Sequence, residues 1–140
     1  MMRAFFDTNI LVYFHDGAEP LKTAVARELF HKCVGAGEFV VSTQVLQELW
    51  VTAARKFSNS AAAVRELIKD LILIDVIQVQ AEDILNAIHW QSQWKISFWD
   101  ALILVSAKRA GASIVYSEDL THGRSYNGVK VMNPFLPLGN

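Results

Sequence analysis

The sequence predicts an α/β domain, with a mainly parallel β-sheet of about five short strands and helices on both faces of the sheet. Short apolar runs alternate along the chain with longer segments of helical periodicity, and this alternation is typical of a parallel sheet. Hydrophobic residues make up 52% of the chain and charged residues 19%, a composition that favours a packed core over disorder. We therefore expect residues 1–140 to form one domain.

The expected strands are runs dominated by β-branched and aromatic residues, which pack well on a pleated surface. Each run is too short for a helix of ordinary length. In chain order they are Arg3–Phe6, Phe39–Ser42, Val76–Val79, Ile114–Ser117 and Val129–Met132.

Between the strands lie segments in which apolar residues recur every three or four positions, as in a helix that packs one face on a sheet. The tripeptide Ser58-Asn59-Ser60 ends one such helix and caps the next, and Gly111 closes the last one at its C-cap. The expected helices are Leu21–Val34, Val45–Phe57, Ala61–Ile74, Ala81–Trp94 and Phe98–Ala110.

Several classes of protein are excluded by what the sequence lacks. No apolar run reaches the ~20 residues that span a bilayer, and Asp7 follows the N-terminus too early for a signal peptide, so a cytoplasmic protein without membrane contact is expected. The four histidines show no zinc-ligand spacing, and no glycine-rich phosphate loop or serine-nucleophile motif is present. The single cysteine, Cys33, has apolar neighbours and is expected to be buried and inert.

Neither charge nor aromatic residues indicate a face that grips nucleic acid. Thirteen Lys and Arg oppose fourteen Asp and Glu, for a net charge of −1. The tryptophans fall at helical spacings and are expected in the core or an interface rather than as base-stacking platforms. They are Trp50, Trp90, Trp94 and Trp99. If the substrate is a nucleic acid, metal ions and a few local cations must therefore offset its phosphates.

Four carboxylates stand where a sheet of this kind binds ligands, beyond the carboxyl ends of its strands or near the start of the following helix. They are Asp7, Glu48, Asp100 and Asp119. Each has a structural alternative. Asp7 closes the first strand and could be the N-cap of a short helix, and Glu48 could be a surface residue about one turn into its helix.

Asp100 precedes Ala101–Val105, a run that is apolar on nearly every face of its helix, so its carboxylate needs a partner. The alternative is a capping box, because Ser97 and Asp100 have the required spacing. Asp119 could open an Asx turn. Its neighbour Glu118 could be the acid that turns inward, and the residues alone leave that choice open.

The four candidates share one chemical property, which is that all of their donor atoms are oxygen. A parallel sheet brings the ends of its strands and the starts of the following helices to one edge. Carboxylates gathered there repel one another, so the cluster persists only if protons or cations neutralise it. Oxygen ligands without His or Cys select hard ions, and the sequence therefore predicts a site for Mg²⁺ or Mn²⁺.

Four segments carry a resemblance to a known family. They are Phe6–Tyr13, Ser42–Leu49, Phe98–Ile103 and Tyr116–Leu120, the last followed by His122-Gly123 and the tail Val131–Phe135. In this order and spacing they resemble the motifs of the PIN domain, and within it the toxin ribonucleases of bacterial toxin–antitoxin modules, the VapC type. The resemblance covers essentially the whole chain.

The resemblance implies a three-layer α/β/α fold and an Mg²⁺- or Mn²⁺-dependent endoribonuclease with the four acids as its catalytic quartet. It favours Asp119 over Glu118 as the fourth acid, and Asn9 and Ser117 match polar positions that support the site. It also implies RNA as substrate, a neutralising antitoxin as partner, and homodimers. Arg124 is a candidate contact for substrate phosphate, with a solvated loop arginine as the alternative.

Three other functions compete with this interpretation. One is a PIN-like nuclease of DNA or of general RNA processing that shares the same site. A second is a catalytically inactive PIN domain serving as a binding module, which the intact quartet argues against. The third is a phosphotransfer receiver, which needs an aspartate after the middle strand, where this chain has Gln78-Val79-Gln80.

Overall fold

The structure is a computed structural model, and it describes residues 2–137. Within these residues six strands form one sheet in the order β3-β2-β1-β4-β6-β5. All neighbouring strands are parallel except β5 and β6. The strands are β1 Arg3–Phe6, β2 Phe39–Ser42, β3 Val76–Ile77, β4 Ala112–Tyr116, β5 Ser125–Tyr126 and β6 Val129–Met132. The predicted α/β class with a mainly parallel sheet is confirmed.

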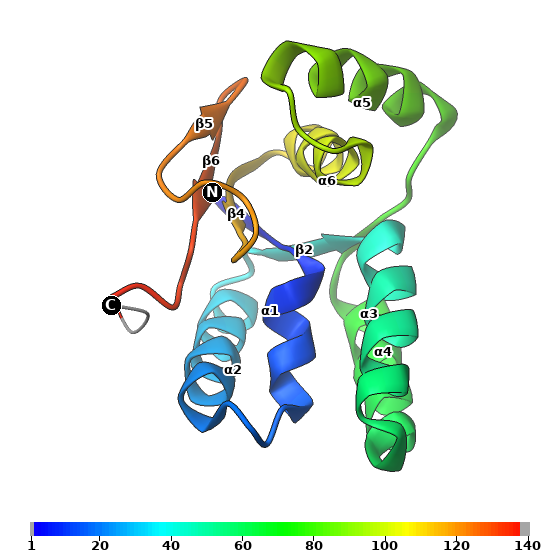
Figure 1. The fold of residues 1–140 in the computed structure, drawn as a ribbon, viewed down its shortest axis with the longest axis vertical. Helices are drawn as coiled ribbons and strands as arrows, with labels where there is room; N and C mark the ends of the chain where they lie inside the picture. The colour runs from blue at the N-terminus through cyan, green and yellow to red at the C-terminus, as the bar shows by residue number, and fades with distance from the viewer. Residues whose placement is uncertain (1, 138–140) are drawn as a thin grey trace.

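Helices cover both faces of the sheet (Figure 1), with α5 and α6 on one side of the strands and α1 to α4 on the other. Short 3₁₀ turns at Tyr13–His15 and Ser58–Ser60 follow α1 and precede α4. The helices are α1 Thr8–Val12, α2 Pro20–Gly35, α3 Thr43–Lys56, α4 Ala61–Ile74, α5 Ala81–Trp94 and α6 Phe98–Arg109. Within residues 2–137, none of them is long and apolar enough to cross a membrane.

The strand predictions differ from the structure in three places. The two-residue strand β5 was not expected; it pairs antiparallel with β6 as the first arm of a hairpin that turns at Asn127 and Gly128, both with positive φ. Strand β3 ends at Ile77, two residues before the predicted end. Strand β4 begins at Ala112 rather than Ile114, because the residues after Gly111 already pair with β1, and it ends at Tyr116, one residue before the predicted end.

The central strand β1 sets the position of the functional edge. It pairs with β2 on one side and β4 on the other, and its residues Ala4, Phe5 and Phe6 are buried. Phe6 and Tyr116 are register partners, so the residues that follow them, Asp7 and Ser117, leave the sheet side by side. Helices α1 and α3 begin immediately after β1 and β2, so their first turns lie at this same edge.

Candidate active site

A pocket of about 340 Å³ opens at the carboxyl end of the sheet. All four carboxylates singled out from the sequence line it, and they come from four separate parts of the chain. Asp7 follows β1, Glu48 lies on α3, Asp100 is in the first turn of α6, and Asp119 follows β4. The remaining lining residues are Thr8, Asn9, Val12, Tyr13, Thr52, Lys56, Trp99 and Ile103.

Asp7 is the most deeply placed of the four, with 5% of its surface exposed. Its carboxylate is the N-cap of α1, accepting a hydrogen bond from the Thr8 N–H (2.7 Å). The Ser117 hydroxyl donates to the other oxygen of the same carboxylate (2.8 Å). Asp7 is therefore a helix cap and also part of the pocket wall, and the two interpretations of this residue do not compete.

Burial raises the pKa of Asp7 from an ordinary 3.8 to about 7, because a charged carboxylate loses its hydration in the interior. The hydrogen bonds from Ser117 and Thr8 oppose this rise, whereas the charges of Glu48 and Asp100 add to it. At neutral pH the Asp7 carboxyl group is therefore protonated in part of the molecules and charged in the rest. A cation in the pocket would favour the charged form.

Glu48 is held by α1 although it belongs to α3. The Thr8 hydroxyl donates a hydrogen bond to its Oε1 atom (2.8 Å). Thr8 is itself buried, so this contact orients a partly buried carboxylate toward the pocket rather than toward open solvent. Sequence reasoning missed Thr8, because a threonine at the first position of a helix has no pattern that marks it as a partner of a distant acid.

Asp100 lies in the first turn of α6, where Ser97 is the N-cap and accepts a hydrogen bond from the Asp100 N–H (3.0 Å). Burial raises the pKa of the Asp100 carboxyl; the Ser97 side chain lowers it, and the charge of Asp119 raises it further. The start of α6 is tied to α3 by the buried Gln44, whose Nε2 donates to the Trp99 carbonyl oxygen (3.1 Å). Sequence reasoning did not identify Gln44 in this role.

Ser117 shapes the loop that carries Asp119. Its buried hydroxyl accepts hydrogen bonds from the N–H groups of Asp119 (3.2 Å) and Leu120 (3.4 Å) while donating to Asp7. The turn is therefore built on a serine rather than on an Asx turn at Asp119. The Asp119 side chain is exposed and lines the pocket.

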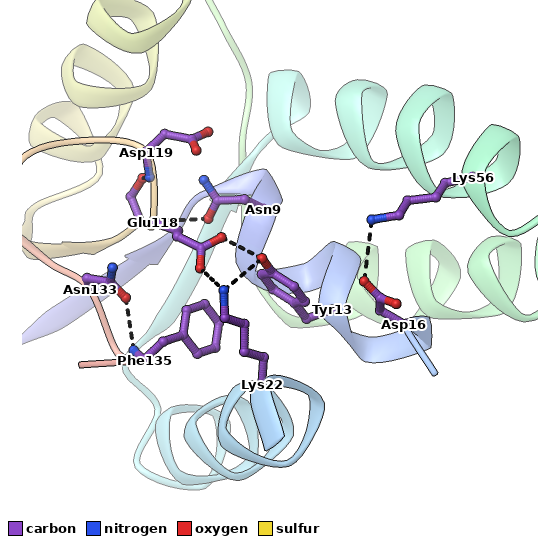
Figure 2. Close-up of polar contacts among 10 residues, drawn as sticks. Asn9, Tyr13, Asp16, Lys22, Lys56, Glu118, Asp119, Asn133 and Phe135 are labelled. Carbon is purple, nitrogen blue, oxygen red and sulfur yellow. Dashed lines mark hydrogen bonds and ion pairs between the residues drawn. The ribbon is translucent and has the colours of Figure 1, made fainter. Parts of the chain in front are cut away.

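Glu118 does not line the pocket, and its carboxylate lies between Tyr13 and Lys22 (Figure 2). Tyr13 Oη donates to its Oε1 and Lys22 Nζ to its Oε2, both at 2.5 Å. The hydrogen bond to Glu118 raises the pKa of Lys22. Asn9 lines the pocket, and its Oδ1 accepts a hydrogen bond from the Glu118 N–H (3.2 Å). Asp119 rather than Glu118 therefore lines the pocket, and Glu118 anchors the loop.

Arg124 does not line the pocket. Its exposed guanidinium lies 5.3 Å from the ring centroid of Trp94 and 5.1 Å from that of Tyr126. Its suggested contact with substrate phosphate stays a prediction. Among the lining residues that sequence reasoning did not place at the site are Lys56, from the end of α3, and Trp99, beside Asp100.

The pocket suits a hydrated divalent ion better than a fully protein-bound one. Within the described residues, no group of three or more His, Cys, Asp or Glu side chains is arranged to hold a metal as it stands. Mg²⁺, however, usually keeps several waters and binds through one or two carboxylates. The pocket fits such an ion, because it has the volume for a hydrated ion and carboxylates on its walls. One of these carboxylates is the buried Asp7, whose pKa is raised to about 7.

Comparison with protein families identifies the fold. The family model named PIN domain matches residues 4–124, which includes all four pocket carboxylates. The chain belongs to the PIN-domain family. No curated protein matches the sequence significantly.

Solved structures share this PIN fold at low sequence identity. The Mycobacterium tuberculosis toxin VapC20, described as cleaving the sarcin–ricin loop, is 22% identical with a TM-score of 0.69, covering 83% of this chain and 89% of its own. A toxin–antitoxin complex from Klebsiella pneumoniae is 19% identical with a TM-score of 0.71, covering 94% of this chain and 97% of its own. DNA-bound VapBC from Salmonella typhimurium is 17% identical with a TM-score of 0.69, covering 96% of this chain and 99% of its own. At these identities the likeness establishes the fold.

Proposed function

We propose that this PIN domain is an Mg²⁺- or Mn²⁺-dependent endoribonuclease and the toxin of a toxin–antitoxin pair acting in the cytoplasm. One observation carries the proposal. The family's four acidic positions, which are far apart in the sequence, line one pocket here, and the most buried of them has a pKa raised to about 7. A buried carboxylate surrounded by others is costly unless a cation offsets it.

In this proposal Asp7, Asp100 and Asp119 hold the ion, directly or through water. A bound divalent ion supplies two effects, lowering the pKa of an attacking water and neutralising charge on phosphate oxygens. The chain's own residues orient the reactants. Thr8 fixes one oxygen of Glu48, which leaves the other oxygen to orient or deprotonate the attacking water. Ser117 holds Asp7 and the Asp119 turn in one arrangement.

The toxin assignment is supported by the solved PIN structures of similar fold. One is described as a toxin that cleaves the sarcin–ricin loop, and another as a toxin–antitoxin complex. We extend both properties to this chain, so that a neighbouring gene is expected to encode a protein that neutralises it. A homodimer is also part of the proposal.

Cleavage of RNA by the purified protein tests the enzymatic part. We expect cleavage in Mg²⁺ or Mn²⁺ and none in excess EDTA, because the pocket acids offer only oxygen ligands. Asp100→Asn should remove activity while the protein stays folded, since Ser97 rather than the Asp100 carboxylate caps α6. Equal cleavage in EDTA, or a folded and fully active Asp100→Asn protein, contradicts the assignment.

Expression in cells tests the toxin part. Wild-type protein should arrest growth, whereas Asp100→Asn should not, and co-expression of the neighbouring gene should relieve the arrest. A nuclease that is active in vitro but harmless when well expressed would instead favour a PIN nuclease of general RNA processing.

A further inference from the structure

Trp99 is the unusual aromatic residue of the pocket. Although it sits beside Asp100 in the first turn of α6, 60% of its surface is exposed. A tryptophan buries up to about 250 Å² when it packs, so one left in solvent forgoes a large stabilisation. Trp90 on α5 is 9% exposed and belongs to the core, whereas the exposure of Trp99 places it outside the core.

The Trp99 side chain is carried on a well-fixed backbone. The buried Gln44 donates a hydrogen bond to the Trp99 carbonyl oxygen, tying this turn of α6 to α3. The Phe98 ring lies 5.1 Å from the Trp99 ring at an interplanar angle of 78°, so Phe98 does not stack on Trp99 in parallel. An exposed aromatic ring on a rigid backbone can stack on a flat ligand at small entropic cost.

Lys56 supplies the one cation among the residues that line this pocket in the described part of the chain. It shares a face of α3 with Glu48 and Thr52, because the three are spaced four residues apart. Lys56 lies two helical turns beyond Glu48, roughly 12 Å along the axis. It is therefore placed for a phosphate other than the one held among the carboxylates.

The Lys56 ammonium is oriented but remains accessible. Its Nζ contacts Asp16 Oδ2 at 3.3 Å (Figure 2), and the Lys56 side chain is 56% exposed. Asp16 is 5% exposed, and its Oδ1 accepts a hydrogen bond from the Ala18 N–H (3.1 Å). An ammonium has three donors, so one contact with Asp16 leaves donors for an anion from solvent.

We propose that Trp99 and Lys56 form a nucleotide subsite for single-stranded RNA, with a base stacked on the Trp99 ring and a neighbouring phosphate at Lys56. This inference rests on the proposed ribonuclease function. The charged surroundings of Trp99 differ from an apolar protein-docking face, because its pocket neighbours include Asp100, Asp119 and Lys56. The other exposed tryptophan, Trp50, lies instead in an apolar groove with Leu46, Ile68 and Ile72.

Binding measurements in an Asp7→Asn background, chosen to prevent cleavage, test the subsite. The probe is a fluorescent single-stranded RNA 12-mer of mixed sequence, compared with an abasic 12-mer of equal charge. Trp99→Ala should weaken binding to the RNA roughly 5- to 150-fold, and Trp99→Phe should keep most of the affinity. The abasic probe should bind equally well with and without Trp99. Trp50 is 44% exposed, so Trp50→Ala is the matched control. It should not change the affinity for either probe.

The salt dependence separates the two residues. Lys56→Gln should reduce the slope of log K against log salt by about 0.7, the value for one phosphate of a single strand, whereas Trp99→Ala should leave the slope unchanged. The inference is overturned if the parent does not bind the RNA at low salt, or if Trp99→Ala behaves like Trp50→Ala. It is also overturned if Trp99→Ala weakens the binding of both probes equally, or if it changes the oligomeric state of the protein in solution and leaves the affinity for RNA unchanged.

Failure of the ribonuclease proposal would look different. Wild-type protein would then cut no RNA in any divalent ion, whatever the affinities of the Trp99 and Lys56 variants. Metal-dependent cleavage by wild type, together with normal RNA binding by Trp99→Ala, would retain the enzyme and remove the subsite.

Discussion

Asp7→Asn is expected to lower metal-dependent RNA cleavage on the order of a thousandfold or more without unfolding the protein. The change removes the most buried anionic oxygen of the pocket. The asparagine keeps a carbonyl oxygen that can accept the Thr8 N–H, so the cap of α1 survives. Its amide replaces the oxygen that accepts the Ser117 hydroxyl proton, so only this one hydrogen bond to the end of β4 is lost. Initial cleavage rates, with circular dichroism to check the fold, give the measurement.

Asp70→Asn provides the control for this experiment. Asp70 is an exposed residue of α4 that does not line the pocket, and the chemical change is identical. It should leave the cleavage rate unchanged. An Asp7→Asn protein that cleaves RNA within a few-fold of wild type would show that Asp7 is a helix cap and no part of the catalytic machinery.

The second large effect concerns stability in the absence of metal. The Asp7 pKa is raised to about 7 in the folded protein, against 3.8 ordinarily, so the folded state holds this proton more tightly than the unfolded state. The free energy of unfolding should therefore fall as pH rises from about 4 to about 7. The Asp7 contribution to this loss is on the order of 4 kcal/mol. It is absent below pH 4, where the carboxyl is protonated in both states.

Asp7→Asn lacks this titration, so its stability relative to wild type should rise across the same pH range. Urea unfolding of both proteins at pH 4, 5.5, 7 and 8 in chelator gives the difference, and groups that titrate in both proteins cancel. Asp70→Asn should follow wild type at every pH. If the wild-type and Asp7→Asn stabilities stay parallel from pH 4 to 8, Asp7 is not a carboxyl group of raised pKa.

Much of the architecture could be predicted because periodicity and residue type report burial directly. The runs at Arg3–Phe6 and Phe39–Ser42 are strands with the predicted bounds, and Ala81–Trp94 is a helix with the predicted bounds. Strand β5 could not be predicted, since two residues carry no period. Its pairing depends on a turn at Gly128.

The choice between Glu118 and Asp119 shows what local sequence leaves out. Two adjacent acids in a loop have the same chemistry, and no period separates them. In the structure the Glu118 carboxylate accepts hydrogen bonds from Lys22, which lies 96 residues earlier in the chain, and from Tyr13. The exposure of Trp99 has a similar origin, because helical spacing gives the direction of a side chain but not whether a neighbouring element covers it.

A thermal melt of wild type and Asp7→Asn across a Mn²⁺ titration, at fixed ionic strength and with a chelated reference, tests the proposed metal site most directly. A metal that binds only the folded site stabilises wild type by roughly 2.7 kcal/mol at 100 times its dissociation constant. We expect the wild-type melting temperature to rise with Mn²⁺ and the Asp7→Asn protein to show a much smaller rise. No metal-dependent rise in wild type, or an equal rise in both proteins, would contradict a metal site built on Asp7.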